Sequence, residues 1–333
     1  MNAVVFYDQN GNGKIDSDEL VRFPGVQLNV GNLRGNAAPN GTVSVAGVPA
    51  GIQTLLVSED SLPPYYVTDA PMSVQVPQET ASEVPVPITL PIGANTPNVY
   101  MAFGDSITVG DGSTDGTGYR GPLATQLQAF FGAATITNQG IEATRSLAGA
   151  ERIASTFAGN TCPPTSPTDP PVPCTPAFVL IHYGTNDWNE SACRDAPPCY
   201  TITSLQTIVE TVKNSTSHPF LATIIPVNVG YDERVPPQRE TWVHNQDALI
   251  RQLAAQEGVV LVDLEAAFLK AFADNGGDYQ VYFTDHVHPS DLGYQLMAKT
   301  FFEAITQPNS SVAAGLQAFS LRPPGPSSTF PNP

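Results

Sequence analysis

Two different hydrophobic patterns divide the chain. In residues 1–93, short runs in which apolar and polar residues alternate, such as 26–30, 42–45 and 53–57, are separated by clusters of Gly and Pro. Alternation with a period of two is typical of strands with one buried face, and no helical periodicity interrupts it. We therefore predict a small all-β sandwich of antiparallel strands here.

From residue 98 onward, continuous apolar runs alternate with amphipathic segments. The runs predict buried parallel strands and the amphipathic segments predict helices, so residues 98–306 should form a three-layer α/β domain. A linker at 94–97 precedes it. Residues 307–333 are Pro-rich and aperiodic, which predicts a tail that wraps the surface or is disordered. The strands are expected at 99–103, 134–137, 177–183, 221–225 and 259–262, and the helices near 123–131, 205–212, 242–256 and 292–305.

Composition narrows the possible partners. The 333 residues include 14 Lys and Arg against 31 Asp and Glu, for a formal charge of -17. Such a surface repels phosphate backbones and anionic lipid, so we expect no nucleic-acid partner. No apolar run is long enough for a transmembrane helix, and the chain starts in a strand pattern, so we expect any export signal to have been removed. The oligomeric state is left open.

The cysteines indicate an oxidising compartment. All four, Cys162, Cys174, Cys193 and Cys199, lie in polar, Pro-rich segments, which predicts two disulfides and an extracellular or cell-surface location. Zinc binding is the alternative, but no Cys-x-x-Cys spacing supports it. The first pair precedes the strand at 177–183 and the second follows it, a separation of roughly 20 Å. Because bonded cysteines need Cα atoms within about 7 Å, we expect Cys162 to pair with Cys174 and Cys193 with Cys199.

Polar residues follow two of the predicted parallel strands. Ser106 comes after the strand at 99–103, and Asn186 comes after the strand at 177–183. In a doubly wound sheet of order 2-1-3-4-5, these first and third strands flank the point where ligands bind. Ser106 and Asn186 should therefore face one crevice.

A base and an acid for a serine nucleophile occur near the end of the chain. Asp285 and His288 are three residues apart, so one tight turn can bring both side chains together, whereas His286 is too close in sequence to share that bond. The backbone N–H groups of Ser106 and Gly140 and the Asn186 side chain are candidate oxyanion donors. Gly140 could instead be an ordinary turn glycine.

These segments resemble the conserved blocks of the SGNH or GDSL hydrolase family. The blocks are Gly104-Asp105-Ser106, Gly140, Gly184-Thr185-Asn186-Asp187 and Asp285 with His288, and they span residues 98–306. The resemblance implies a flavodoxin-like α/β/α domain with Ser106 as nucleophile, Gly140 and Asn186 as oxyanion donors, and Asp285 and His288 completing a triad. Asp105 and Asp187 are expected to fix loops. No Gly-x-Ser-x-Gly motif points to the α/β-hydrolase fold instead.

The first domain contains a candidate calcium loop. Asp8–Glu19 fits the twelve-residue pattern, in which Gly13 supplies the sharp turn. A solvated acidic turn is the alternative. The expected Ca²⁺ ligands are the side chains of Asp8, Asn10, Asn12, Asp16 and Glu19 and the carbonyl of Lys14.

A strand pattern, rather than a helix, precedes this loop, so a regulatory EF-hand pair is not expected. With Pro24-Gly25, Pro49-Ala50-Gly51 and Leu62-Pro63-Pro64 farther on, residues 1–93 resemble the calcium-binding B-type repeats of bacterial surface adhesins. The resemblance implies a prealbumin-like sandwich in which calcium is structural. Triad hydrolysis itself requires no cofactor.

The sequence therefore predicts a secreted esterase that forms an acyl-enzyme on Ser106. The polar loops around the site favour short acyl chains. A carbohydrate deacetylase of the acetyl xylan type and a lysophospholipase are the alternative enzymes, and a surface attachment or glycan-binding protein is the non-enzyme alternative. Trp188, which follows Asn186, is expected either to line the crevice or to serve as a packing residue.

Overall fold

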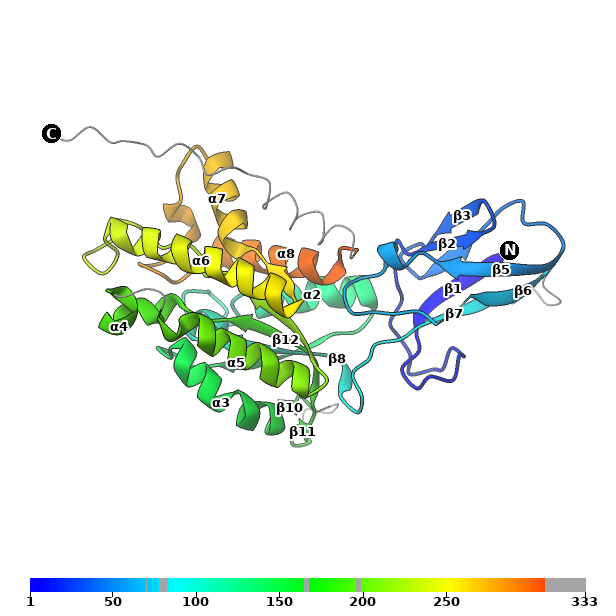
Figure 1. The fold of residues 1–333 in the computed structure, drawn as a ribbon, viewed down its shortest axis with the longest axis horizontal. Helices are drawn as coiled ribbons and strands as arrows, with labels where there is room; N and C mark the ends of the chain where they lie inside the picture. The colour runs from blue at the N-terminus through cyan, green and yellow to red at the C-terminus, as the bar shows by residue number, and fades with distance from the viewer. Residues whose placement is uncertain (70, 78–82, 165–167, 196–198, 309–333) are drawn as a thin grey trace.

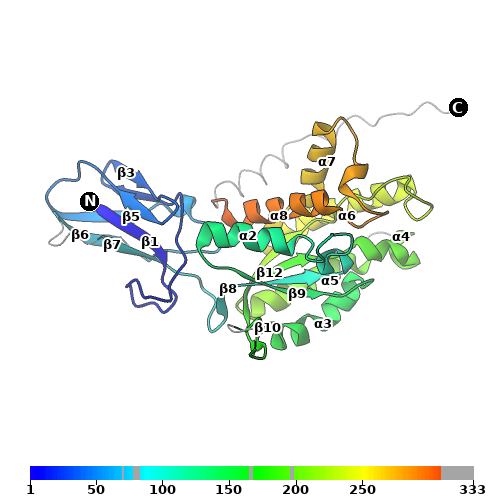
Figure 2. The same ribbon diagram turned by 180° about the vertical axis from the view of Figure 1, so that it is seen from behind.

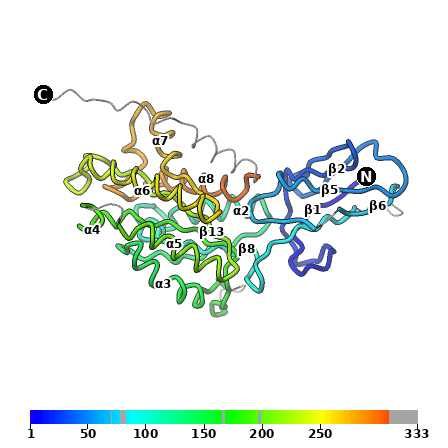
Figure 3. The backbone as a smooth tube through the Cα atoms, viewed as in Figure 1, coloured from blue at the N-terminus to red at the C-terminus, as the bar shows by residue number. Residues whose placement is uncertain are grey.

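The computed structural model describes residues 1–308 apart from 70, 78–82, 165–167 and 196–198. Strands β1–β7 form one end of the molecule, and alternating strands and helices form the other (Figure 1). The view from behind shows the same two parts (Figure 2), and the backbone tube follows the chain from β7 into β8 between them (Figure 3). The predicted tail lies, from residue 309, outside the described residues.

The first part consists of two sheets that share a core. One has the order β3 (Leu33–Asn36), β2 (Gln27–Val30), β5 (Gly51–Val57), β6 (Met72–Val76), and the other has the order β4 (Thr42–Ser44), β1 (Asn2–Tyr7), β7 (Val84–Ile88). Alternate residues of both sheets enter one buried apolar cluster, among them Val5, Leu28, Leu55 and Val86. The period-two pattern therefore reflects the buried face of each sheet.

One pairing differs from the antiparallel arrangement that we predicted, because β1 runs parallel to β7. These are the first and last strands of this part, so no hairpin between them dictates their relative direction. β7 lies at the edge of its sheet and contains Pro85 and Pro87. Proline has no N–H for a second neighbouring strand, which explains why β7 occupies an edge.

The second part contains a five-stranded parallel sheet. Its order is β14 (Val260–Val262), β13 (His218–Ala222), β12 (Pro176–His182), β8 (Thr96–Gly104), β9 (Thr135–Gly140). Numbered along the chain within this part, the order is 2-1-3-4-5, as predicted. All seven residues of β12 are buried, which is why the apolar runs are continuous. Because β8 begins at Thr96, the predicted linker at 94–97 ends inside the strand.

Helices cover both faces of this sheet. On one face, α3 (Ser146–Ala158), α5 (Tyr200–Asn214) and α6 (Pro237–Glu257) bury apolar side chains with Met101 and Val179. On the other, α2 (Arg120–Phe131), α7 (Leu264–Asp274) and α8 (Asp291–Thr306) pack against Tyr100 and Leu180. The three-layer α/β/α prediction is confirmed, whereas α3 and α7 were not predicted. None of the helices in the described ranges is long and apolar enough to cross a membrane.

Both disulfides form between neighbouring cysteines, as predicted. Cys162 of β10 (Thr161–Cys162) is bonded to Cys174, just after β11 (Val172–Pro173). Cys193 of α4 (Ser191–Arg194) is bonded to Cys199, which precedes α5. The second bond therefore closes the loop that follows Asn186.

The two parts of the molecule are joined by Tyr65 and by a continuous core. The Tyr65 hydroxyl donates to the Pro219 carbonyl at 2.6 Å and accepts from the Val260 N–H at 3.0 Å. Its ring stacks on His218, with centroids 4.4 Å apart. Phe23 of the first part meets Phe131 of α2 edge-on at 6.0 Å. These contacts fasten the first part to the amino-terminal edge of the parallel sheet.

Candidate active site

The predicted site residues lie at the carboxyl edge of the parallel sheet. Ser106 begins helix α1 (Ser106–Val109) directly after β8, and Asn186 lies in the 3-10 helix η2 (Thr185–Asn189) after β12. Gly140 is the last residue of β9. Asp285 and His288 lie in the loop between η3 (Gln280–Tyr282) and α8. Because β9, β8 and β12 are adjacent, residues distant in sequence meet at one edge.

A hydrogen-bonded chain joins three of these side chains. His288 Nε2 lies 2.9 Å from Ser106 Oγ, and His288 Nδ1 lies 2.7 Å from Asp285 Oδ2. Asp285 Oδ1 also accepts the backbone N–H groups of Val287 and His288, each at 2.8 Å. Partial burial raises the pKa of Asp285, but the hydrogen bonds from the His288 side chain and these amides outweigh it and hold the pKa below its ordinary value.

His286 occupies a different position. Its Nδ1 lies 3.5 Å from Asp285 Oδ1 and has no hydrogen-bond partner among the described residues. Burial lowers the pKa of His286. The histidine placed between Ser106 and an acid is thus His288, the one that the spacing predicted.

The three expected oxyanion donors are not equally free to bind a substrate oxygen. Ser106 is the first helical residue of α1, where a backbone N–H has no partner within the helix. Asn186 Nδ2 donates to the Thr144 carbonyl at 3.1 Å and lies 3.5 Å from Asp105 Oδ2. The Gly140 N–H donates to Asn138 Oδ1 at 3.0 Å, so Asn138 must turn away before Gly140 can bind an oxyanion.

Gly140 lies too close to the backbone of α1 to carry a side chain. A Cβ at this position would approach the Val109 nitrogen to 2.6 Å and the Asp105 carbonyl oxygen to 2.8 Å. The absence of a side chain therefore lets β9 pack against the backbone of α1.

The two aspartates of the motifs organise loops, as expected. Asp105 caps α1 by accepting the Ile107 N–H at 3.0 Å, and burial raises its pKa to about 7. Asp187 accepts the N–H and hydroxyl of Ser146 at 2.9 and 2.6 Å and the Thr201 hydroxyl at 2.7 Å. Burial raises the pKa of Asp187 as well. These bonds tie the loop after β12 to the first turns of α3 and α5.

The sequence of the α/β part matches a known family. A model of the GDSL-like Lipase/Acylhydrolase family matches residues 102–296, more than half of the chain. The chain belongs to this family. It is accordingly a carboxylic ester hydrolase, as predicted for residues 98–306. No curated protein matches the sequence significantly.

Several solved structures are distantly similar to this GDSL-family hydrolase. An acetylxylan esterase from Geobacillus stearothermophilus is 20% identical, with a TM-score of 0.49, covering 65% of this chain and 96% of its own. A lipase/acylhydrolase from Enterococcus faecalis is 20% identical, with a TM-score of 0.48, 63% coverage of this chain and 95% of its own. A lipolytic protein from Veillonella parvula is 21% identical, with a TM-score of 0.48 and coverages of 63% and 98%.

Arg152 of the hydrolase was not predicted as a site residue. Its Nη2 donates to the carbonyls of Gly104 at 3.1 Å and Gln139 at 2.7 Å and to the Tyr183 hydroxyl at 2.6 Å. The guanidinium lies over the Phe103 ring, 4.1 Å from its centroid. One side chain therefore ties together the ends of β8, β9 and β12, from which the site residues emerge. The signal that could have indicated it, a cation within a helical segment after Gly140, depends on recognising α3.

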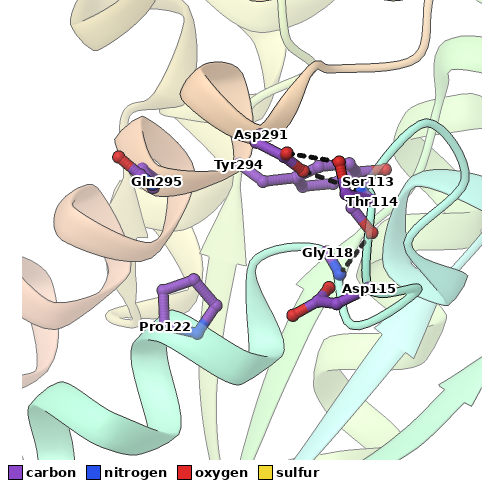
Figure 4. A pocket seen from close by; sticks show the side chains of 8 residues that line it. All are labelled: Ser113, Thr114, Asp115, Gly118, Pro122, Asp291, Tyr294 and Gln295. Atoms are coloured by element: carbon purple, nitrogen blue, oxygen red, sulfur yellow. Dashed lines mark hydrogen bonds between the residues drawn. The ribbon is translucent and has the colours of Figure 1, made fainter.

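The loop at 110–118 lies against the first turn of α8 (Figure 4). Asp291 accepts the N–H of Thr114 at 2.8 Å and its hydroxyl at 2.6 Å, and the Tyr294 hydroxyl donates to the Asp111 carbonyl at 2.6 Å. A Cβ on Gly112 would come within 3.2 Å of His288 Cβ. The loop therefore packs tightly against the His288 turn and helps to fix it.

The loop Asp8–Glu19 folds around its first carboxylate. Asp8 accepts the N–H groups of Gly11, Asn12 and Gly13 at 2.8, 3.2 and 2.8 Å. Asn10 Nδ2 and Asn12 Nδ2 both lie 2.7 Å from Asp16 Oδ2, so these three side chains converge on one point. The oxygen and nitrogen of an amide can be exchanged by rotation, which would direct amide oxygens to that point.

The chemistry of these side chains fits Ca²⁺, which prefers carboxylate and carbonyl oxygens. Glu19, nearly fully buried, accepts the N–H groups of Gln9 and Asp16, at 2.8 and 3.1 Å. Among the described residues, however, no three carboxylate, His or Cys side chains are grouped closely enough to hold a metal by themselves. Calcium binding by this loop, and the likeness of residues 1–93 to B-type repeats, remain predictions.

Proposed function

We propose that this hydrolase is a serine esterase that cleaves carboxylic esters through an acyl-enzyme on Ser106. The observation that carries the proposal is the hydrogen-bonded chain from Ser106 Oγ through His288 to Asp285, at 2.9 and 2.7 Å. A serine hydroxyl is a weak nucleophile by itself and becomes a strong one when a base takes its proton. The carboxylate of Asp285 keeps His288 in the tautomer whose Nε2 can act as that base.

In the first half-reaction, Ser106 Oγ attacks the ester carbonyl carbon while its proton passes to His288 Nε2. The negative charge that develops on the carbonyl oxygen would be bound by the backbone N–H of Ser106 and by the Asn186 Nδ2 hydrogen that does not bond Thr144. The Gly140 N–H would join them once Asn138 has moved. His288 then gives its proton to the leaving oxygen. The bond between that oxygen and the acyl carbon breaks, which releases the alcohol and leaves the acyl group on Ser106.

Water completes the reaction. His288 Nε2 takes a proton from water as the water oxygen attacks the acyl carbon. The bond to Ser106 Oγ then breaks, Ser106 recovers its proton from His288, and the carboxylic acid leaves. No metal takes part in either half of this mechanism.

We infer a preference for short acyl chains. The loop at 110–118, beside His288, consists of Gly, Asp, Ser and Thr residues, which give a long alkyl chain little apolar surface to cover. Acetylated carbohydrates are one class of substrate with a short acyl group. A lysophospholipase is the alternative, and it requires efficient hydrolysis of long-chain esters.

Two further proposals concern the protein as a whole. The disulfides Cys162–Cys174 and Cys193–Cys199 support an extracellular or cell-surface location, because such bonds persist in oxidising compartments. The loop Asp8–Glu19 would hold Ca²⁺ through the side chains of Asp8, Asn10, Asn12, Asp16 and Glu19 and the Lys14 carbonyl. There the ion would stabilise the sandwich and play no part in the chemistry.

Hydrolysis of p-nitrophenyl esters from acetate to palmitate, by the wild type and by Ser106→Ala, tests the proposed function. Activity that is highest on acetate and lost in the variant supports a short-chain serine esterase. A maximum at long chains would favour the lysophospholipase. Equal activity in both proteins would refute the role of Ser106. No activity on any ester would favour the alternative of a glycan-binding protein.

A further inference from the structure

A hollow of about 540 Å³ lies beside the loop that carries Asn186. Trp188 belongs to the same 3-10 helix as Asn186, and Gln238 and Trp242 come from the first turns of α6. The two elements are linked, because Arg239 Nη2 donates to the Thr185 carbonyl at 3.1 Å. β12, which leads into this helix, is the direct neighbour of β8, which leads to Ser106. The hollow therefore lies at the same edge of the sheet as the proposed site.

Two indole rings form the apolar part of the hollow. The rings of Trp188 and Trp242 meet at 67°, with centroids 5.9 Å apart. Trp242 is only 4% exposed, and its Nε1 donates to the Cys193 carbonyl at 3.0 Å. Trp188 is partly exposed. The hydrogen bond to Cys193 and burial thus fix the Trp242 ring, and Trp188 is the ring that a ligand can reach.

The rim of the hollow is polar and carries both signs of charge. Arg194 and Asp195 form an ion pair, with Nε 3.0 Å from Oδ1. The Arg194 guanidinium also lies 6.0 Å from the centre of the Trp188 ring. Gln238 and Asn245 are exposed on α6 and add amide donors and acceptors. Arg194 directly follows Cys193, which is bonded to Cys199.

We propose that this hollow binds a pyranose ring of an acylated oligosaccharide whose ester is cleaved at Ser106. The inference rests on the proposed esterase function and names its substrate class. One face of a pyranose consists of C–H groups that pack on the electron-rich face of an indole. Its hydroxyls need donors and acceptors together, which the rim provides. An alkyl chain would leave that rim without partners, and the paired charges do not favour a strongly ionic ligand.

Intrinsic fluorescence can test binding directly, because the chain contains two tryptophans and both line this hollow. The protein is the full chain with Ser106→Ala, and the probes are the unacylated sugars xylotetraose and cellotetraose. We expect a saturable change in emission with at least one of them. A further Trp188→Ala change should abolish it, Asn245→Ala should weaken it, and Trp242→Phe should retain a response from Trp188. Gln256→Ala, on the same helix but outside the hollow, is the matched control.

Kinetics with Ser106 intact separate this inference from the proposed function. In Trp188→Ala, kcat/KM for acetylated xylo-oligosaccharide, divided by kcat/KM for p-nitrophenyl acetate, should fall by about tenfold. Gln256→Ala should leave the ratio unchanged. If p-nitrophenyl acetate is cleaved only when Ser106 is present, but the ratio stays constant and neither sugar alters emission, the sugar site is wrong and the esterase stands. A response to aromatic carboxylic acids instead of sugars would also overturn it. If Ser106→Ala retains hydrolysis, the esterase mechanism fails first.

Discussion

Asp285 holds His288 at two points. Its Oδ2 lies 2.7 Å from the ring nitrogen Nδ1, and its Oδ1 accepts the backbone N–H of the same histidine at 2.8 Å. The first contact requires a proton on Nδ1, which leaves Nε2 as the acceptor that faces Ser106. The second fixes the turn, so the orientation of the ring does not depend on the ring bond alone.

The first prediction concerns the tautomer of His288. In Asp285→Asn, the amide can donate to Nδ1 and favour the wrong tautomer, so kcat should fall by about 10³–10⁴-fold with little change in KM. Steady-state hydrolysis of p-nitrophenyl acetate measures this. His286→Asn is the control, because His286 Nδ1 lies 3.5 Å from Asp285 Oδ1 and makes no contact with the Oδ2 that meets His288. Equal losses in the two variants would contradict the assignment of Asp285.

The second prediction concerns the pH dependence of stability at Asp105. Burial raises its pKa from 3.8 to about 7. Between pH 3.8 and about 7, Asp105 keeps its proton in the folded chain and has released it in the unfolded chain. The free energy of unfolding therefore falls as pH rises through this range, and Asp105 causes no further loss at higher pH. Asp105→Asn has no such proton.

The melting temperature of Asp105→Asn relative to wild type should therefore increase from pH 4 to pH 7, by several degrees, and then stay level. Differential scanning calorimetry at constant ionic strength measures the difference. Asp69→Asn, at an exposed position, is the control and should track the wild type. A difference that does not vary with pH would mean that Asp105 is ionised throughout.

Much of the α/β domain could be predicted because its strands are buried on both faces. The seven residues of β12 are all buried, so the apolar run in the sequence directly reports the strand. The contact between Asp285 and His288 could also be predicted, since the two residues are local in sequence and need only a turn to meet. Ser106 could be added because parallel strands end at the same edge of a sheet.

Helix α3 could not be recognised because small residues occupy much of its buried face. Its buried positions are Ser146, Gly149, Ile153 and Phe157, and two of these are not hydrophobic. A Cβ on Gly149 would approach the Tyr183 ring to 2.8 Å, so close packing selects glycine there. Because the helix was not predicted, the position of Arg152 beside the strand ends could not be predicted either. The parallel pairing of β1 with β7 could not be predicted either, because these strands are the first and the last of residues 1–93 in the sequence.

The third prediction tests Arg152 as a positioning residue. Arg152→Met removes donors from the carbonyls of Gly104 and Gln139, which should lower kcat/KM by about tenfold and the free energy of unfolding by about 2–3 kcal/mol. Arg152→Lys keeps the charge but lacks the planar guanidinium that donates to several acceptors at once. Compared with Arg152→Met, it should therefore restore the free energy of unfolding more than kcat. Glu151→Gln, exposed on the same helix, is the control. If kcat falls only in proportion to the folded fraction, Arg152 has a purely structural role.

The fourth prediction concerns calcium. Removal of Ca²⁺ with a chelator should lower the melting temperature by several degrees and leave kcat unchanged at temperatures where the chain is folded, because the ion would bind only the folded loop. Asp16→Asn should abolish the effect, since Asn10 and Asn12 converge on that carboxylate. Asp18→Asn, exposed in the same loop and not an expected ligand, should retain it. If the melting temperature does not change when Ca²⁺ is removed, the loop is a solvated acidic turn and not a calcium site.

The fifth prediction concerns the junction between the two parts of the molecule. In Tyr65→Phe, the Pro219 carbonyl and the Val260 N–H lose the hydroxyl that they share, which should cost about 1–3 kcal/mol of unfolding free energy. Tyr231→Phe, at a side chain that is 50% exposed, is the control. Urea unfolding should be followed by tryptophan emission, which reports only on the α/β part, and by circular dichroism, which reports on both. Because one apolar cluster runs through both parts, the two signals should change together in the wild type. Two separate transitions, with only one of them shifted by Tyr65→Phe, would show that the sandwich folds independently despite this shared core.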